Sequence, residues 1–572
     1  MATAGERPRT GAIGTVVGLV LGVLVLGPAL APGYTLHYDL VFVPDLDLSA
    51  RTLGTDGSVP RAVPNDLLVA LGSLLLPGWL VQKVLLLGAF VLGGAGAGRL
   101  ATTGVGAVAA ATWWSWNPWV GERLGIGHWG YLLGFALLPW VLLAAGRVRS
   151  TGAGLPALLV ALTAAALGGS TPGVLATLLA VLVVLVPGGP ARPRARSLAA
   201  VLGISLLANA AWWWPFLRAS SRTADPGGAS AFSSAGDTPF GPLGSLVLGG
   251  GLWNDRTWFL ERTTWPVATA ALVAVLAVLV LAMRRRHWWQ DPVSRGATLA
   301  GGVGLVVAAV GALPGGRELL EALITSVPGA GLLRDGQKFA ALWVLLLAVA
   351  LARVVDRLRT DRVPAVVLAV AVAWPVATLP TLGWGHGGAW GSEPWPEEVA
   401  SVRQRLVDSG DPVAVFPWST YRQQEWNGNR VVLDPWNRLL PQRVVSDDRL
   451  PLRGADPVAG EDPVGAAVAA GLTKGEDVTA ILREHGIRWV LVQTDQPTPK
   501  GTMPSLPGEP AIVSGDLEVY DLGRSTATQP SPDAWRGLGL VGTGLAVVIS
   551  LALWWRAAGM RRDARSRRLA LK

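Results

Sequence analysis

Three carboxylates follow the first long apolar run of the chain. Asp39, Asp45 and Asp47 stand in the segment Tyr34–Asp47, and His37 lies beside the first of them. A carboxylate near an apolar surface loses solvation, which favours its protonated form and lets it accept a proton from a hydroxyl group. The cluster could therefore supply a general base. Acids of an ordinary solvated loop would have the same composition.

A second charged cluster lies in the short segment between two later apolar runs. Glu122, Arg123 and His128 occur there together, between Trp116 and Trp129. The planar fork of arginine matches phosphate oxygens, and histidine adds a further donor. The segment is thus a candidate phosphate site. The alternative is a salt-bridged turn with aromatic anchors on either side.

A third cluster combines two cations at the start of another apolar run. Arg334 and Lys338 stand about one helical turn apart, so both can face one lipid phosphate. The alternative is that both side chains extend to lipid head groups and hold no specific ligand.

Aromatic and amide side chains gather much later, in the segment Pro417–Asn427. Trp418, Tyr421, Arg422 and Trp426 could stack on a sugar and hydrogen-bond it. Packing of an ordinary loop is the alternative. The chain has no phosphate-cradling glycine loop, no metal-spaced His or carboxylate set and no nucleophile elbow, so we expect no cofactor and find no support for a divalent metal.

Composition places these clusters on a membrane protein. The chain has 572 residues, of which 51% are hydrophobic and 15% charged. Each of its apolar blocks is roughly 20 residues long, which is the length that a helix needs to cross one hydrocarbon core. About twelve transmembrane helices are expected, at residues 12–31, 79–98, 101–117, 129–146, 153–168, 172–187, 197–216, 264–283, 296–313, 337–352, 363–381 and 537–555. The run at residues 65–78 predicts an interfacial or re-entrant helix.

The distribution of charge predicts the orientation. If the N-terminus is inside, every inner segment is net basic, with Arg99, Arg147, Arg284, Arg353 and the arginine-rich tail among its residues. The net charge of +9 is then a topology signal, and nucleic acid is not an expected partner. The chain has no Cys, which excludes disulfides and thiolate chemistry. We expect a multi-pass protein of the cell membrane with both termini cytoplasmic.

Three outer segments are long enough to carry function, at residues 32–66, 217–263 and 382–536. The last is the size of a domain. Val413–Phe416, Arg488–Gln493 and Leu517–Leu522 read as strands, and Glu476–His485 reads as a helix closed by Gly486. We therefore expect a transmembrane domain at 1–381, an extracytoplasmic α/β domain at 382–536, and a final transmembrane helix with a basic cytoplasmic tail at 537–572.

These segments resemble the GT-C class of polytopic membrane glycosyltransferases, and specifically the actinobacterial cell-wall arabinofuranosyltransferases. The likeness rests on the acidic first outer loop, on Asn117-Pro118 with Glu122-Arg123 and Gly127-His128-Trp129, on Leu138-Pro139-Trp140, and on Arg334-Asp335 with Lys338-Phe339. The chain lacks the long carbohydrate-binding extension of the largest members. The acceptor is therefore not carried over from the family.

The resemblance implies an inverting transfer of a sugar, of the arabinofuranosyl or the mannosyl series, from a polyprenyl-phosphate donor to a cell-envelope glycan or lipid. The catalytic carboxylate would be Asp39, with Asp45 and Asp47 as alternatives. The donor phosphate would be bound by Arg123, His128, Arg334 and Lys338. Acceptor or sugar contacts would come from Glu122, Trp418, Tyr421, Arg422 and Trp426.

Two other functions share these features. A transporter or flippase of a lipid-linked saccharide would have the same spans, but ionisable residues in mid-span should then mark its path. Here they lie mostly at span ends, and the two halves of the chain show no repeat. A non-catalytic envelope-assembly protein could keep the fold without the chemistry. The test that separates them is whether a carboxylate and cations meet at one outer cavity.

Overall fold

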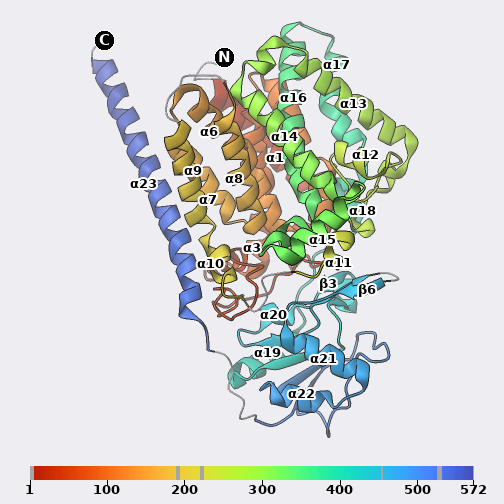
Figure 1. The fold of residues 1–572 in the computed structure, drawn as a ribbon. Coiled ribbons are helices and arrows are strands. Elements are labelled where there is room, and N and C mark those ends of the chain that lie inside the picture. The colour runs from red at the N-terminus through yellow and green to blue at the C-terminus, as the bar shows by residue number, and fades with distance from the viewer. Residues whose placement is uncertain (1–5, 188–193, 220–223, 453–454, 525–530, 571–572) are drawn as a thin grey trace.

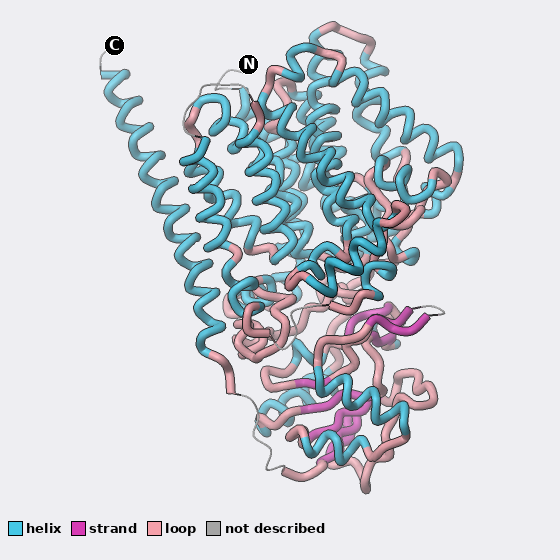
Figure 2. The backbone as a smooth tube through the Cα atoms, in the orientation of Figure 1, coloured by secondary structure: helices cyan, strands magenta, loops and turns pink. Residues whose placement is uncertain are grey.

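The protein is described by a computed structural model that covers residues 6–187, 194–219, 224–452, 455–524 and 531–570. The expected segments 217–263, 382–536 and 537–572 each lie in part outside these residues. A helical bundle forms one end of the molecule and a smaller sheet-containing part forms the other (Figure 1). Figure 2 shows that the described strands gather below the bundle.

In the part of the chain that the structure describes, the bundle is built from twelve longer helices. They are α1 (Glu6–Leu26), α3 (Gly78–Gly98), α4 (Gly104–Ser115), α6 (Trp129–Thr151), α7 (Leu155–Ala166), α8 (Ser170–Leu185), α9 (Arg194–Ala208), α13 (Trp265–Met283), α14 (Pro292–Ala309), α16 (Ala340–Thr360), α17 (Ala365–Ala377) and α23 (Ala534–Ala570). Shorter helices connect them: α2 (Asn65–Ser73), α5 (Pro118–Gly125), α10 (Ala210–Phe216), α11 (Gly227–Ala231), α12 (Gly241–Val247), α15 (Gly316–Ser326) and α18 (Gly383–Gly388). The turn η7 (Gly336–Phe339) leads into α16.

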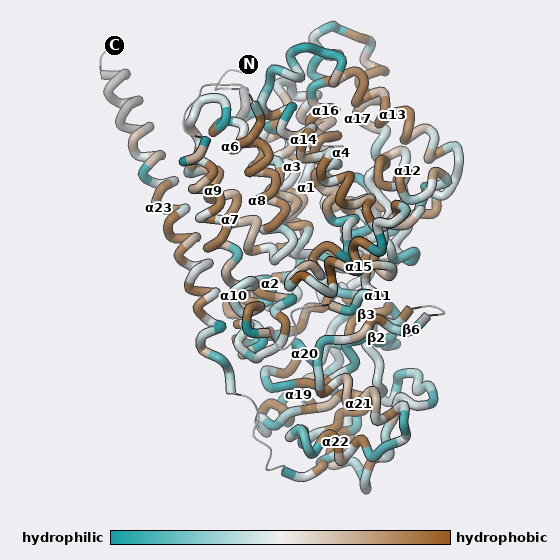
Figure 3. The backbone as a smooth tube through the Cα atoms, in the orientation of Figure 1, coloured by the Kyte–Doolittle hydropathy of each residue, from teal (hydrophilic) through white to brown (hydrophobic). Residues whose placement is uncertain are grey.

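Length and composition identify the membrane-crossing helices. Within the described residues, seven helical segments are long and apolar enough to cross a membrane, or up to nine if the bent pairs α9 with α10 and α17 with α18 each form one span. The helices α7 and α8 are apolar but shorter. Each of the twelve predicted spans falls on a helix or bent pair. The polytopic helical membrane class is therefore confirmed, and the number twelve stays a prediction. In Figure 3 the middle of the bundle is largely hydrophobic.

Glycine allows the first two bundle helices to pack backbone against backbone. A Cβ atom at Gly14 or Gly18 of α1 would overlap the carbonyl oxygens of Gly94 and Phe90 on α3, and one at Gly98 would overlap Thr10. Small residues are what membrane helices use for such close approach, since lipid supplies no hydrophobic driving force between them. This contact holds α1 against α3.

The sheet part follows the bundle in the chain. Its strands are β1 (Val413–Phe416), β2 (Tyr421–Gln423), β3 (Val431–Leu433), β4 (Val444–Val445), β5 (Leu450–Leu452), β6 (Ala455–Val458), β7 (Trp489–Gln493), β8 (Ile512–Ser514) and β9 (Leu517–Asp521). Its helices are α19 (Glu397–Ser409), α20 (Trp436–Leu439), α21 (Pro463–Lys474) and α22 (Val478–Glu484).

Five of these strands form one mixed sheet in the order β4-β1-β7-β9-β8, and β2–β3 and β5–β6 form two hairpins. Strand β1 runs parallel to β4 and β7, while β9 pairs antiparallel with β7 and β8. The predicted strands at β1, β7 and β9 are confirmed. The predicted helix is α22, and Gly486 follows it with φ +74°, the left-handed conformation of a helix end.

The first loop joins the bundle to the sheet part. Tyr34 forms an antiparallel bridge with Glu393, and Tyr38 forms a parallel bridge with Val432 of β3. The backbone N–H of Leu433 donates to the carbonyl of Tyr38 at 2.8 Å. The acidic segment is therefore held between the two parts of the molecule.

Candidate active site

Asp39 is linked to the second charged cluster by direct hydrogen bonds. Its Oδ2 lies 3.1 Å from Nε2 of His128, and Nδ1 of His128 lies 3.0 Å from a terminal guanidinium nitrogen of Arg123. Arginine only donates, so Nδ1 of His128 must accept and Nε2 must carry the hydrogen. That hydrogen points at Asp39. Arg123 thus orients the ring of His128, and His128 in turn orients the Asp39 carboxylate.

The backbone around Asp39 allows the first loop to pack closely against the turn before α6. Gly127 has φ +85°, and a Cβ there would overlap the backbone N of Leu40. The N–H of Asp39 donates to the carbonyl of Ile126 at 3.1 Å. Tyr38 has φ +42°, a conformation that is uncommon for a non-glycine residue and that clusters at functional sites. The turn before α6 and the first loop are therefore packed against each other at the carboxylate.

Arg123 connects this pair to the third cluster. Its terminal nitrogens donate to both carboxylate oxygens of Asp335 at 2.6 and 2.9 Å, and its Nε donates to Gln337 at 3.0 Å. The side chain of Arg123 is 0% exposed. Although burial opposes it, the Arg123 guanidinium lowers the pKa of Asp335 to about 2. Arg123 and Asp335 thus form a permanently charged pair beside His128.

The expected contact of Arg123 with a donor phosphate does not fit this geometry. All three of its guanidinium nitrogens already donate to protein acceptors, and its side chain has no exposed surface. Its geometric role is to hold His128 and Asp335. Arg334 lines a pocket and can meet a ligand, whereas Lys338 is buried in η7 within electrostatic range of Asp335 and does not line that pocket.

Glu122 is likewise an interior residue. It is fully buried and accepts the backbone N–H groups of Gly251 and Leu252 at 3.1 Å, together with the side chain of Gln337. Burial, followed by the charge of Asp237, raises the pKa of Glu122. Because Glu122 braces the turn after α12 against Gln337, it does not fit the expected acceptor contact.

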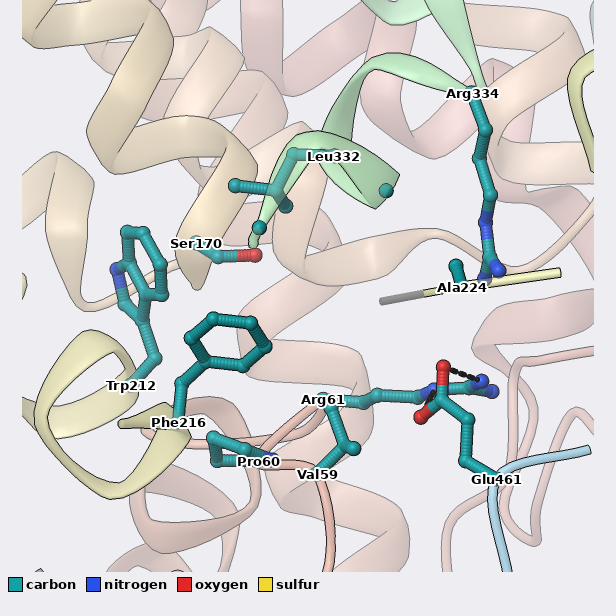
Figure 4. A pocket seen from close by; sticks show the side chains of 12 residues that line it. Val59, Pro60, Arg61, Ser170, Trp212, Phe216, Ala224, Leu332, Arg334 and Glu461 are labelled. Carbon is teal, nitrogen blue, oxygen red and sulfur yellow. Dashed lines mark hydrogen bonds and ion pairs between the residues drawn. The ribbon is translucent and has the colours of Figure 1, made fainter. Parts of the chain in front are cut away.

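A pocket opens beside the site at the junction of the bundle and the sheet part. It has a volume of about 140 Å³. Figure 4 shows Trp212 and Phe216 of α10 on one side and the Arg61–Glu461 ion pair on the other. Arg334 extends toward that pair from the segment before η7. The pocket therefore combines an aromatic end with a cationic end.

Electrostatics connect the pocket to Asp39. The surrounding protein lowers the pKa of Arg61, but the carboxylates of Glu461, Asp448 and Asp39 more than offset this and raise it. Desolvation and the charge of Arg61 lower the pKa of Arg334. Arg61 thus lies within electrostatic range of both Asp39 and Arg334.

The other two acids of the first loop lie apart from this network. Asp47 forms an ion pair with Arg403 of α19 at 2.8 Å, and Asp45 is exposed without a hydrogen bond to His128. Only Asp39 of the three bonds to the second cluster. The sequence placed all three in one loop, but their spacing along an irregular backbone did not indicate which one would turn inward.

The residues of the sheet part that were predicted to contact a sugar also differ in whether they lie near the site. Trp418 is 3% exposed within a core under the sheet, and Arg422 is buried in an ion pair with Asp434 at 2.7 Å. Neither fits contact with a sugar. Trp426 packs on Trp395. Tyr421 lies edge-on to Tyr38, and burial together with the charge of Asp39 raises its pKa, so Tyr421 is the member of this set that lies near the site.

Several members of the site were not singled out by the sequence. Gln337 links Arg123 to Glu122, Arg262 pairs with Asp237 at 2.5 Å, and Arg61 pairs with Glu461. Arg61 and Glu461 are 400 positions apart, so no local pattern could join them. The one available signal for Arg61 was its position in the acidic first loop. Within the described residues, no group of three or more His, Asp or Glu side chains could hold a metal ion.

The fold and this charged junction define a polytopic helical membrane protein whose candidate site lies at the end of the bundle that faces a small sheet. No family model and no curated protein matches the chain. Among solved structures, it is similar to the mycobacterial arabinofuranosyltransferase AftD, with a TM-score of 0.56 and 19% identity over 92% of this chain. A mutant of AftD gives the same TM-score at 18% identity.

This likeness concerns the fold. The chain spans 40% of the length of AftD in the first of these structures and 42% in the second. The resemblance to GT-C arabinofuranosyltransferases that the sequence indicated is thus confirmed at the level of the fold.

Proposed function

We propose that the protein is a membrane glycosyltransferase that moves a sugar from a polyprenyl-phosphate donor to a cell-envelope glycan or glycolipid on the outer face of the membrane. The observation that carries the proposal is the hydrogen-bonded network of Asp39, His128, Arg123 and Asp335, next to which Arg334 lines a pocket. These residues come from three segments far apart in the sequence. A carboxylate, a donor that orients it and a free cation are what such a transfer needs.

In the proposed reaction, the acceptor hydroxyl oxygen attacks the anomeric carbon of the donor sugar. Its proton passes to the Asp39 carboxylate, which is 41% exposed and therefore accessible. The bond between the anomeric carbon and the phosphate oxygen breaks, and its electron pair leaves with the polyprenyl phosphate. Attack from the face opposite the phosphate inverts the configuration. General-base catalysis of this kind contributes roughly 10² to 10⁴-fold.

Arg334 would stabilise the departing phosphate, and the buried Lys338 would add positive charge behind it. Arg334 makes no ion pair among the described residues and contacts the ring of Phe232 at 4.8 Å. Cations placed where negative charge develops are most effective in a site that excludes water. The aromatic end of the pocket, at Trp212 and Phe216, suits the first apolar units of the lipid.

The orientation in the membrane follows the charge pattern. The N-terminal end of α1 and the C-terminal end of α23 lie at the end of the bundle opposite the sheet part (Figure 1). With the basic segments in the cytoplasm, the site and the sheet part face the outside. That side is where a lipid-linked sugar and an envelope acceptor would meet.

A turnover assay tests this function. Membranes containing the protein are incubated with a panel of radiolabelled polyprenyl-phosphate sugars, beginning with arabinofuranose because of the fold shared with AftD. We expect label to move from lipid to an envelope glycan or glycolipid. In proteoliposomes, a carrier would instead move the intact lipid-linked sugar across the bilayer without cleaving it, and that result would contradict the proposal.

A further inference from the structure

The sheet part reaches into the pocket through one acidic side chain. Glu461 stands in the loop between β6 and α21, and its two carboxylate oxygens accept from Nε and a terminal nitrogen of Arg61 at 3.0 and 2.6 Å. The side chain of Arg61 is 52% exposed, whereas that of Glu461 is 19% exposed. A long and exposed arginine side chain would otherwise sample many rotamers. Glu461 therefore restricts Arg61 to one orientation.

The loop that carries Glu461 is itself held firmly. The Asp448 carboxylate accepts the backbone N–H groups of Glu461 at 2.6 Å and Asp462 at 3.0 Å. A Cβ at Gly460 would overlap that carboxylate, so glycine is needed there. Residues that are locked by hydrogen bonds of this kind hold a neighbouring functional group more precisely than free loop residues do.

A second support comes from the bundle side. Asp225, which precedes α11, accepts the backbone N–H of Ala459 at 2.6 Å. The loop at residues 459–462 is thus tied to the sheet part by Asp448 and to the bundle by Asp225. It crosses the junction at the cationic end of the pocket, where Arg334 of the bundle faces the Arg61–Glu461 pair (Figure 4).

We infer that Glu461 is a positioning residue, which holds the Arg61 guanidinium across the pocket from Arg334 so that both cations grip one lipid phosphate. The inference rests on the proposed function and deepens it, because it makes the sheet part a component of the donor site. Arg61 presents a forked donor set to Glu461, and its side chain, which is 52% exposed, also lines the pocket.

Binding of a fluorescent polyprenyl phosphate in detergent micelles tests the inference without any need for turnover. We expect Glu461→Gln to weaken binding about two- to fivefold, in line with the strength of a partly exposed ion pair. The KM for the lipid-linked donor should rise by the same factor while kcat stays unchanged. Glu476→Gln is the matched control, because Glu476 pairs with Lys474 in the same part of the chain without lining the pocket.

A variant in which the two charges are exchanged distinguishes a positioning role of Glu461 from a role that only attaches the sheet part to the bundle. The double variant Arg61→Glu with Glu461→Arg keeps the ion pair but places an anion on the bundle side of the pocket. We expect its thermal unfolding to match the unchanged protein while probe binding stays at least tenfold weaker, since a hydrogen bond to a charged group contributes about 1.5 to 3 kcal/mol. Full recovery of binding would overturn the inference and leave the pair as a structural tie.

The outcomes also distinguish this inference from the proposed function. If the unchanged protein does not bind the probe, the lipid-phosphate site is wrong and the inference falls with it. If the unchanged protein binds the probe and Glu461→Gln binds it equally well, only the positioning role is overturned.

Discussion

Two buried arginine–aspartate pairs, one in the bundle and one in the sheet part, differ in what surrounds them. Arg123 and Asp335 have side-chain exposures of 0% and 11%, and Arg422 and Asp434 have exposures of 1% and 2%. In the sheet part, Asp434 also accepts from Gln493 and from the backbone of Trp436. That pair is enclosed within its own domain, and neither residue lines the pocket shown in Figure 4.

The pair in the bundle is connected by hydrogen bonds to an exposed carboxylate. Arg123 hydrogen-bonds His128, and His128 hydrogen-bonds Asp39, whose side chain is 41% exposed. Arg334, next to Asp335 in sequence, lines a pocket. A buried ion pair is by itself weak evidence of function, since such pairs also hold domains together. The pair in the bundle is distinguished by its link to an accessible carboxylate and by its proximity to Arg334, and this link is what makes it a candidate site.

The largest effect is expected from the accessible end of the bundle network. Asp39→Asn removes the proposed base while keeping its shape, so sugar transfer should fall by roughly 10² to 10⁴-fold. Insertion and thermal unfolding should remain unchanged. Asp45→Asn changes an exposed acid of the same loop and should keep full activity in the same radiolabel assay. Equal activity of Asp39→Asn and Asp45→Asn would remove Asp39 from the mechanism.

Disrupting each ion pair should distinguish function from stability. Arg123→Met and Arg422→Met each leave a buried aspartate without its partner and should each cost about 3 to 5 kcal/mol of stability. Adding Asp335→Leu or Asp434→Leu removes the unpaired buried charge and should recover much of the lost stability.

The two double variants should then differ in activity. The one in the sheet part should transfer sugar, whereas the one in the bundle should stay inactive because His128 has lost Arg123. Denaturant unfolding in micelles and the transfer assay measure the two quantities. An active Arg123→Met/Asp335→Leu protein would contradict the proposed role of this network.

Acid should weaken the first loop through His37. Burial lowers the pKa of His37 to about 4, and the ring stacks on Trp390 and lies 3.0 Å from the carbonyl of Leu124. Between pH 6.5 and 4 the unfolded chain binds a proton that the native chain does not, so the free energy of unfolding should fall as pH falls, by at most about 3.4 kcal/mol. Above pH 6.5 this group contributes no pH dependence.

A histidine substitution checks that assignment. His37→Gln should flatten the stability profile between pH 6.5 and 4, as measured by thermal unfolding. His485→Gln, at an exposed histidine of the sheet part, should leave the profile as it is. An unchanged slope in His37→Gln would assign the acid sensitivity to another group.

The smallest effect concerns the free cation of the pocket. Arg334→Ala should raise the donor KM about tenfold, as expected for one charge-assisted hydrogen bond to phosphate. Arg317→Ala changes an exposed arginine of α15 and should have no effect on KM. Steady-state kinetics with varied donor measure both. A rise in KM of the same size in both variants would indicate a general effect of surface charge.

Much of the fold could be predicted from the sequence because its signals are local. Apolar runs marked the helices that are long enough to cross a membrane, shorter apolar runs marked β1 and β7, and alternating residues marked β9. The three charged clusters were also visible, since Asp39, Arg123 and Arg334 each stand at the end of an apolar run.

The contacts within the site could not be predicted in the same way. The choice of Asp39 over Asp47 depends on Gly127 and on a hydrogen bond to Ile126 about 90 positions away. The burial of Trp418 and Arg422 depends on how the hairpin β2–β3 folds against the sheet. The pairing of Arg61 with Glu461 depends on the whole docking of the sheet part onto the bundle.

The most direct test of the central claim is a structure of the protein with a polyprenyl-phosphate sugar bound. The account predicts that the phosphate lies within hydrogen-bond distance of Arg334 and that the anomeric carbon faces the Asp39 carboxylate across a gap that admits one hydroxyl group. A ligand bound elsewhere on the bundle, with Asp39 and Arg334 both remote from its phosphate, would contradict the claim that these segments form one transferase site.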